Sequence, residues 1–432
     1  MKNMRRPQKS PGLSELKPNT NILNDSRSLE LAREYNEKYL HWDRLRYYDC
    51  GDYGRESLWY LMRTIRASTC RKVELEGLSM TYNIPDRFLE PLHEIDLALS
   101  SDIIPIEGFD EKRKVTLSVS SMMEESIASS QMEGAVSTTK EAKRMLRNNT
   151  APRNTSEKMI LNNYRAMEFI RSNLDRELSP ELISELHGII TEDTLESRGF
   201  EGEFRRDDSI AVRDILTGEI YYEPVPHEMI EPMIGDLCRF ANDDSEYIHP
   251  VIKGILIHFI MAFIHPFMNG NGRISRSLFY WYTMKKGYSV MGYLSISKEI
   301  REHKGGYEEA YRLSETDGND VTYFIDYNLK MLMSAVDTFS GYLRKKIDER
   351  RRVRDLMDTD NLTQRQADIL VSLMNSDIPQ DIYEITAKLG VSTQTVRNEM
   401  HTLIEKGYVR ESSKDGHRQR FAFAEKDSRA EE

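Results

Sequence analysis

The chain has 432 residues, which is too long for one compact core, so we expect two or three domains. Charged residues make up 30% of the chain and hydrophobic residues 39%, as in an ordinary globular protein. The net charge of −11 argues against a protein that coats nucleic acid or an anionic membrane without specificity, although it leaves room for a local basic face.

The cysteine usage favours a reducing compartment. Cys50, Cys70 and Cys238 are odd in number and widely spaced, so buried free thiols are a better interpretation than a metal site. The basic N-terminus has no apolar core and therefore does not read as a signal peptide. No run reaches the roughly 18 apolar residues of a membrane span. We therefore expect a cytoplasmic protein with no membrane partner.

The first part of the chain is predicted to be helical after a disordered start. Residues 1–28 are rich in Pro, Asn, Ser and Lys, which favours disorder. Residues 29–114 have apolar residues at helical spacing and form a predicted helical N-terminal domain. Within residues 115–149, one helix is predicted to end at Gly134, and the next begins with capping-box spacing at Thr138.

Residues 150–340 form the predicted central domain, which is also mainly helical. Between residues 199 and 226, β-branched and aromatic residues surround Leu216-Thr217-Gly218, which predicts a β-hairpin. Residues 341–361 are highly charged and predict a solvated connecting helix. The chain as a whole is therefore predicted to be mainly α.

A dense motif, HPFMNGNGRISR, follows the apolar run GILIHFIMAFI and extends from His265 to Arg276. Pro266 ends the preceding helix and so places His265 at the helix exit. The glycine-rich loop then enters a helix, and backbone N–H groups at a helix N-terminus bind phosphate. Arg273 and Arg276 are three residues apart, so both side chains can reach back to the same anion.

This combination supplies a base, an anion nest and two positive charges, which suits phosphoryl or nucleotidyl transfer. Two other interpretations stay open on the residues alone. A surface loop with salt-bridged arginines would carry the same turn residues. His258 and His265 lie seven residues apart on one helix face, as a pair of metal ligands would, but no third ligand is evident nearby.

The motif resembles the signature of the Fic family, HPFx(D/E)GNGRxxR. Similar features extend from about residue 75 to about residue 335 and include the stretch from Ser297 to Tyr307. The resemblance implies a Fic-type helical bundle in which the β-hairpin is the flap that docks a target segment. It also implies transfer of AMP from ATP to a Ser, Thr or Tyr hydroxyl of a target protein, or of the chain itself.

The resemblance assigns roles to the motif residues. His265 would be the general base that takes the proton of the attacking hydroxyl, and Phe267 would anchor the loop in the core. The other residues would bind the nucleotide: Gly270, Asn271 and Gly272 as the anion hole, Arg273 at the β-phosphate, Arg276 at the γ-phosphate and Tyr307 at the adenine.

One position departs from the family signature. Asn269 stands where the family has Asp or Glu, an acid that holds Mg²⁺ against the α- and β-phosphates. The neutral amide oxygen of Asn269 is a weaker ligand, because Mg²⁺ prefers carboxylate and phosphate oxygens. We therefore expect Asn269 to hold the metal only weakly, through the phosphates, with a higher Mg²⁺ or Mn²⁺ requirement or an altered reaction.

A second motif lies in SIASSQMEGAVST, residues 126–138. Ser129 and Glu133 are four residues apart and share one helix face, which by itself also fits an ordinary helix end. The stretch resembles the inhibitory motif of the Fic family, (S/T)xxxE(G/N). The resemblance implies that Glu133 pairs with Arg276 in place of the γ-phosphate, and a partly buried pair worth about 2 kcal/mol would weaken ATP binding tens-fold.

Residues 362–424 read as three helices followed by a hairpin, which resembles a winged helix-turn-helix domain, and residues 425–432 form a tail. Residues 392–406 would be the recognition helix. DNA is therefore a candidate partner through residues 392–420. The alternative is a protein-docking or dimerisation module, since the unit is close to charge balance.

The sequence thus predicts an autoinhibited protein adenylyltransferase that uses ATP and Mg²⁺ or Mn²⁺. One alternative is a nucleotide-sensing DNA-binding regulator, which Asn269 favours and the intact His265 disfavours. Another is a Fic enzyme that uses a different phosphate-containing donor or removes AMP. The target protein is not identified by the sequence, and a homodimer stays open.

Overall fold

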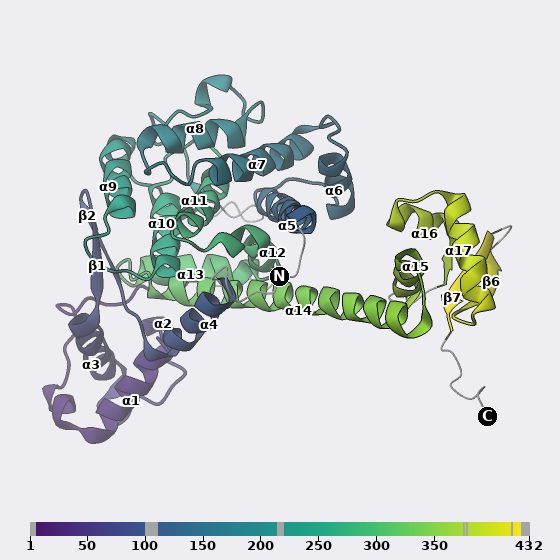
Figure 1. Cartoon of the computed structure of the whole chain (residues 1–432). Helices are drawn as coiled ribbons and strands as arrows, with labels where there is room; N and C mark the ends of the chain where they lie inside the picture. Colours follow the sequence, from purple (N-terminus) through teal and green to yellow (C-terminus); the bar gives the residue numbers. More distant parts are fainter. Residues whose placement is uncertain are drawn as a thin grey trace. The chain divides into compact units, whose positions relative to one another are not determined.

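The computed structural model of the protein describes residues 6–99, 111–213, 220–374, 376, 379–415 and 418–424. The chain divides into two compact units, Met1–Phe339 and Ser340–Glu432. Helix α14, Thr322–Asp360, contains the boundary between them, so the charged stretch that we predicted as a connecting helix continues a helix of the first unit. The fold is mainly α, which confirms the predicted fold class (Figure 1).

The disorder predicted for residues 1–28 is wrong for residues 6–28. Ile22 is fully buried, and with Leu16 it joins a cluster that contains Trp42 and Trp59. Hydrogen bonds of Ser10 to Thr316 and of Asn19 to Ser57 also hold this polar segment, and composition alone does not reveal such contacts. The elements of this region are η1 (Thr20–Asn24), α1 (Ser26–Glu37), α2 (Trp42–Leu45) and α3 (Gly54–Thr69).

The N-terminal region also contains a β-hairpin that our helical prediction missed. Strands β1 (Arg71–Leu75) and β2 (Leu78–Tyr82) pair in antiparallel register around Glu76 and Gly77. Gly77 has φ +68°, which suits a two-residue hairpin turn. The elements η2 (Asp86–Phe88) and α4 (Leu89–Leu99) follow.

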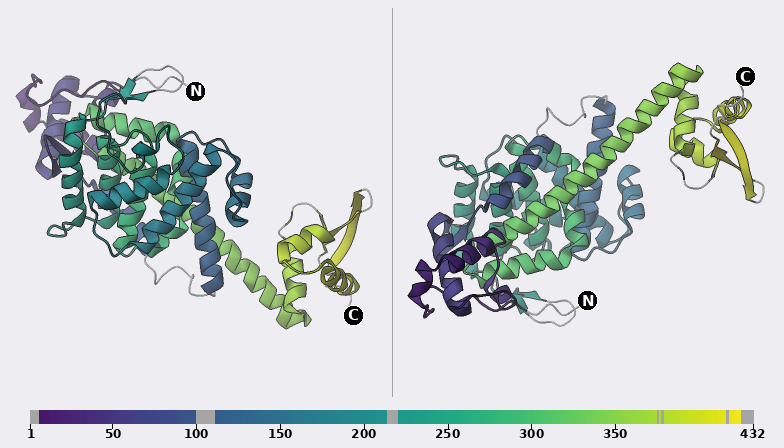
Figure 2. Two further views of the ribbon diagram at one scale, coloured as in Figure 1. Left: turned by 90° about the horizontal axis from the view of Figure 1, so that it is seen from above. Right: turned by 90° about the horizontal axis from the view of Figure 1, so that it is seen from below.

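Helices α10 (Pro250–Ile264) and α11 (Asn271–Lys285) form the centre of the first unit. Figures 1 and 2 show both helices in its interior, among the helices that pack on them. Most residues of both are buried, which is why the sequence of α10 is apolar on every side. The surrounding elements are α5 (Glu111–Met132), α6 (Thr139–Arg147), α7 (Thr155–Ser172), α8 (Pro180–Thr191), η4 (Arg198–Phe200), η5 (His227–Met229), α9 (Ile230–Asn242), η6 (Ser289–Tyr293), α12 (Ile296–Glu302) and α13 (Lys304–Thr316).

The hairpin predicted between residues 199 and 226 is present as β3 (Val212–Arg213) and β4 (Ile220–Tyr222), which pair antiparallel. Its predicted turn, Leu216-Thr217-Gly218, lies outside the described residues. The hydroxyl of Tyr222 donates to the carbonyl oxygen of Phe263 at 2.6 Å. This bond fixes one strand of the hairpin to the last turn of α10, directly before the motif.

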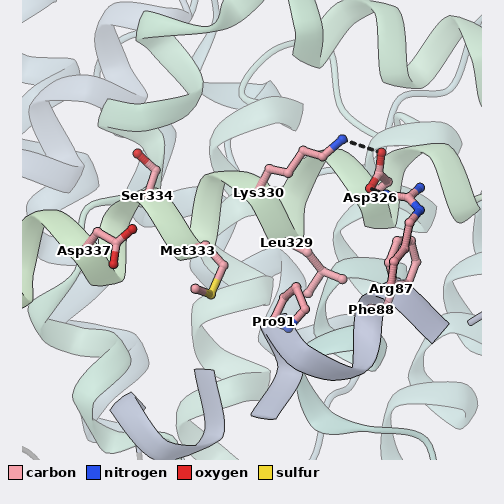
Figure 3. Close-up of a pocket in the computed structure, with 9 residues that line it drawn as sticks. All are labelled: Arg87, Phe88, Pro91, Asp326, Leu329, Lys330, Met333, Ser334 and Asp337. Atoms are coloured by element: carbon pink, nitrogen blue, oxygen red, sulfur yellow. Dashed lines mark hydrogen bonds and ion pairs between the residues drawn. The ribbon is translucent and has the colours of Figure 1, made fainter. Parts of the chain in front are cut away.

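An open groove of about 410 Å³ runs between α14 and the segment η2–α4. Figure 3 shows Arg87 and Lys330 on either side of Asp326 at one end, with Lys330 2.8 Å from that carboxylate. The lining residues come from positions 87–91 and 326–337. The groove therefore contains no residue of the His265–Arg276 motif.

The second unit contains three helices and a small sheet, in the element order of a winged helix-turn-helix. Its strands are arranged β5-β7-β6, with both pairings antiparallel. Gly390 ends α16 with φ +66°, the left-handed turn that glycine allows. The elements are α15 (Gln364–Met374), β5 (Gln380–Asp381), α16 (Ile382–Leu389), α17 (Thr393–Glu405), β6 (Val409–Asp415) and β7 (Arg418–Phe423). In the described part of the chain, no helix has both the length and the apolar character to cross a membrane.

The packing of the N-terminal segment gives a first prediction. Ile22→Ala should lower the free energy of unfolding of this region by about 3 kcal/mol, because it leaves a cavity beside two tryptophans. Leu23→Ala is the matched control, because Leu23 is 42% exposed, and it should change stability by less than about 1 kcal/mol. Urea unfolding followed by tryptophan fluorescence measures both, and equal effects would contradict the packing of residues 6–28.

Candidate functional site

His265 follows the last residue of α10, and its ring is held in one orientation. Its backbone has φ +52° and ψ +55°, a left-handed conformation that non-glycine residues seldom adopt. The carbonyl oxygen of Ala262 accepts from Nδ1–H at 3.2 Å, so Nε2 keeps a free lone pair. Burial lowers the pKa of His265 and outweighs the opposing effects of Ala262 and Glu133. The ring is therefore neutral at pH 7, as a general base must be.

The motif loop is closed by one side chain and packed on another. The amide of Asn271 accepts from the N–H of Phe267 at 3.0 Å and donates to its carbonyl oxygen at 2.7 Å. The buried ring of Phe267 stacks on His187, with centroids 3.6 Å apart. Nδ1 of His187 accepts from Gly202, so its Nε2–H donates to the carbonyl oxygen of Asn269 at 2.8 Å. The burial of His187 lowers its pKa to about 4, so the ring stays neutral.

Arg205 ties both ends of the flap hairpin to the motif. Its Nε donates to the carbonyl oxygen of His265 at 3.1 Å, and its backbone N–H donates to that of Pro266 at 2.8 Å. Its other guanidinium nitrogens bind Asp208 at 2.9 Å and the carbonyl oxygen of Val225. These two partners precede and follow the hairpin. Arg205 therefore positions the flap relative to the base.

Neither His187 nor Arg205 was predicted from the sequence as a residue of the site. A histidine on the apolar face of α8 was the available signal for His187, but an ordinary core histidine gives the same pattern. Arg205 is one of several charged residues in a polar stretch, and only the folded chain shows that its side chain is buried.

The first turn of α11 has the features of an anion site. Gly270 has φ +84°, and a Cβ there would lie 3.0 Å from the side chain of Thr191, so glycine is required. Arg273 is 1% exposed, and its Nη1 donates to the carbonyl oxygen of Ile190 at 2.9 Å. Its buried Nε has no partner among the described residues. A helix N-terminus beside an unused guanidinium donor suits a phosphate oxygen.

Arg276 is held by the two residues of the predicted inhibitory motif. Its Nε donates to Oγ of Ser129 at 3.0 Å, and its Nη2 donates to the carbonyl oxygen of Ser129 at 3.1 Å. Nη2 also lies 2.9 Å from Oε1 of Glu133. The side chain of Arg276 is 4% exposed and that of Glu133 is 27% exposed. The pair therefore lies at the edge of the interior, where solvent screens it only in part.

The carboxylate of Glu133 lies in the anion site. A Cβ at Gly272 would overlap Oε1 of Glu133, so the carboxylate touches the first turn of α11. Burial by itself would raise the pKa of Glu133, but Arg276 and Arg273 outweigh it and lower the pKa. The carboxylate is therefore charged, and it sits where an anionic ligand would contact the same groups.

A buried carboxylate earlier on α5 was also missed by the sequence analysis. Glu125 accepts from the hydroxyl of Tyr280 at 2.8 Å and from the N–H of Ser297 at 2.9 Å, and also from the hydroxyl of Ser297. Burial raises the pKa of Glu125. Glu125 and Ser129 lie four residues apart on one face of α5, and Glu133 directly follows the last residue of the helix, so the three contact α11 in sequence.

Tyr307 reaches the neighbourhood of Arg276 from α13. Burial raises the pKa of Tyr307, and the charge of Arg276 acts in the opposite direction. The Tyr307 hydroxyl lies 2.9 Å from Nε2 of His258, whose pKa is lowered to about 3 by burial. His258 is thus engaged by Tyr307, and among the described residues no group of three or more His, Cys, Asp or Glu could hold a metal ion.

The site offers little to a divalent cation. Oδ1 of Asn269 already accepts from the N–H of Gly270 at 2.6 Å, and the nearby carboxylate of Glu133 is paired with Arg276. The amide oxygen of Asn269 is neutral and already accepts a hydrogen bond, so it is a poor ligand for Mg²⁺, which prefers carboxylate and phosphate oxygens. The residues present therefore do not form a resident metal site.

This geometry defines a class: a helical bundle in which a base and an anion nest share one loop between two buried helices. A family model described as "Fic/DOC family" matches residues 177–283, which include His187, Arg205 and the motif. This part of the chain, which holds the candidate site, is therefore similar to the Fic/DOC family.

Curated relatives match over part of their length. "Protein adenylyltransferase fic-1" of Caenorhabditis elegans is 29% identical over 145 residues, which are 33% of this chain and 27% of that protein. "Protein adenylyltransferase Fic" of Drosophila willistoni is 26% identical over 221 residues, 51% of this chain and 40% of that protein. The chain thus spans less than half the length of these relatives.

Solved structures show the same fold. A Fic family protein from Desulfovibrio desulfuricans G20 superposes with a TM-score of 0.54 at 17% identity, over 81% of this chain and 99% of that chain. Fic-1 from C. elegans superposes with a TM-score of 0.50 at 17% identity, over 76% of this chain and 86% of that chain.

Proposed function

We propose that the protein is an autoinhibited adenylyltransferase that transfers AMP from ATP to a hydroxyl side chain of a protein. The observation that carries the proposal is the position of His265 directly after α10, in the loop that enters the N-terminus of α11 and its two buried arginines. The names of the curated relatives support this class of reaction. The target protein, or the chain's own hydroxyls, would approach along the β3–β4 hairpin.

The proposed chemistry is an attack on the α-phosphate. Nε2 of His265 takes the proton as the hydroxyl oxygen bonds to the α-phosphorus and pyrophosphate leaves. The N–H groups of Gly270, Asn271 and Gly272 face the oxygens that gain charge. Arg273 and Arg276 would hold the β- and γ-phosphates, and Tyr307, which lies near Arg276, would face the γ-phosphate end of the nucleotide. If Mg²⁺ or Mn²⁺ takes part, it would arrive with the nucleotide and neutralise phosphate charge, with Asn269 as a weak ligand.

Glu133 is the proposed inhibitor, with Ser129 as the residue that orients Arg276. ATP and the Glu133 carboxylate compete for the same guanidinium and the same helix N-terminus. In the resting protein the Glu133 carboxylate contacts both the guanidinium of Arg276 and the N-terminus of α11, so it would block the site of the γ-phosphate. The enzyme would thus stay off until something withdraws Glu133.

Removal of this carboxylate should activate the enzyme. Glu133→Gly should raise label incorporation from ATP labelled at the α-phosphorus roughly 30-fold, because it frees a contact of about 2 kcal/mol. Glu133→Gln, which keeps a hydrogen bond and loses the charge, should fall in between. Adding His265→Ala to Glu133→Gly should abolish labelling. Equal labelling by the parent and Glu133→Gly, with or without added Mn²⁺, would contradict autoinhibition.

Restoring the family's acid should change the metal dependence. In the Glu133→Gly background, Asn269→Asp should make ATP bind about tenfold more tightly with Mg²⁺ than without it, because the added carboxylate binds the metal and repels free phosphate. With Asn269 in place, the ratio should be smaller. Calorimetric titration with ATP measures this without catalysis. Equal ratios for both variants would mean that Asn269 already holds the metal.

A further inference from the structure

The C-terminal unit takes no part in the proposed chemistry, and its helix α17 presents a polar stripe. Gln394, Arg397, Asn398 and His401 are all exposed and follow the helical spacing of one face. The opposite face carries Val396, Met400 and Leu403, which are buried in the core of the unit. The packing of the opposite face of α17 therefore leaves the stripe exposed to solvent, and the stripe residues do not contribute to the core of the unit.

Three acidic residues of this unit are engaged away from the stripe, whereas the exposed Glu405 pairs with His401 of the stripe at 3.1 Å. Glu399 lies off the stripe, where it accepts from Gln366 at 2.9 Å and pairs with Arg365 at 3.5 Å. Asp381 and Glu384 form the capping box of α16. Residues 392–420 contain six Lys and Arg against four Asp and Glu, whereas residues 362–391 contain two against four. The excess of basic residues lies after α17, in residues 406–420, whereas α17 itself carries one Arg against two Glu.

We propose that this unit binds double-stranded DNA with α17 in the major groove. Arg, Gln and Asn are the side chains that form paired hydrogen bonds with base edges, Arg with guanine and Gln or Asn with adenine. The exposed Arg410 on β6 is placed to contact phosphate as part of a wing. A protein-docking face would favour apolar anchors, and none of the exposed large apolar side chains described in the structure lies on α17.

The test is enrichment of a pool of random-sequence DNA duplexes on the full chain, followed by fluorescence anisotropy with the selected duplex. The parent should enrich a sequence and bind it with an affinity that falls steeply with salt. Arg397→Ala should weaken binding to the selected duplex roughly tenfold. Arg27→Ala, which removes a similarly exposed arginine of the first unit, should leave binding unchanged.

Two results would overturn the proposal. A pool that shows no enrichment would mean that α17 does not read DNA, and a protein partner would then be the better assignment. Equal binding by the parent and Arg397→Ala would mean that the stripe is not the reading surface. Because Arg397 is exposed on the helix surface, its loss should leave the thermal transition of the protein unchanged.

A second inference concerns the inhibitory helix and rests on the proposed function. Glu125 lies two helical turns before Glu133 and joins α5 to Tyr280 of α11 and to Ser297 of α12. The buried contacts of Glu125 set where α5 lies against α11, and Glu133 meets Arg276 only at that position. We infer that Glu125 is a positioning residue for inhibition, with Ser297 as its partner.

Ser297→Ala tests this inference without altering α5. It removes one hydrogen bond to Glu125, so in the parent it should raise both ATP affinity and AMP transfer several-fold. In the Glu133→Gly background it should change neither, because no inhibitor is left to position. A purely structural role would lower both quantities in both backgrounds, and that result, or no effect in either, would overturn the inference.

ATP affinity measured by calorimetry separates this inference from the proposed function. If no variant transfers AMP but Ser297→Ala still raises ATP affinity only when Glu133 is present, the positioning role holds and the reaction is wrong. If Glu133→Gly transfers AMP and Ser297→Ala has no background-dependent effect, only the positioning role fails.

Discussion

A buried guanidinium needs a negative partner, and Arg276 is the point on which the site depends. Its side chain is almost wholly enclosed, so leaving its charge unpaired would cost several kcal/mol. In the structure that partner is Glu133, supported by Ser129. A nucleotide phosphate would satisfy the same requirement. Under the proposed function, these two anions would compete for one buried cation, and each would exclude the other without any change of fold.

Hydrogen bonds from the surrounding elements fix the positions of Glu133, the motif loop and the flap. Helix α5 is joined to α11 at Glu125 and Ser129, so Glu133, which directly follows α5, is held close to Arg276. The loop is equally constrained, with Asn271 closing it and His187 holding its backbone. Arg205 links the flap to the carbonyl oxygens of His265 and of Pro266, which follows it. The base, the anion nest and the flap are thus parts of one hydrogen-bonded assembly.

Because residue 269 is Asn, this site differs from the family signature in its charge. With a neutral side chain that already accepts a hydrogen bond, the loop contributes no carboxylate of its own. Charge on the bound phosphates would then be balanced mainly by Arg273, Arg276 and the α11 N-terminus. The partly unsatisfied guanidinium of Arg273 is consistent with such a reliance on arginine.

Much of the site can be predicted from the sequence, because its residues lie close together along the chain. The motif from His265 to Arg276 brings the base, the glycines and both arginines together within a single helix–loop–helix, so spacing alone places them. The pair Ser129 and Glu133 shares a helix face for the same reason. The mainly helical fold also follows from periodicity, which a long amphipathic or buried helix displays directly.

Tertiary structure decided what depends on contacts between distant segments. Only folding shows that Glu133 reaches Arg276, that His187 and Arg205 support the loop, and that Glu125 binds Ser297. The burial of Ile22 in a polar segment and the short β1–β2 hairpin escaped prediction for the same reason. Periodicity records which face of an element is apolar, but it carries no information about which partner covers that face, because many partners bury it equally well.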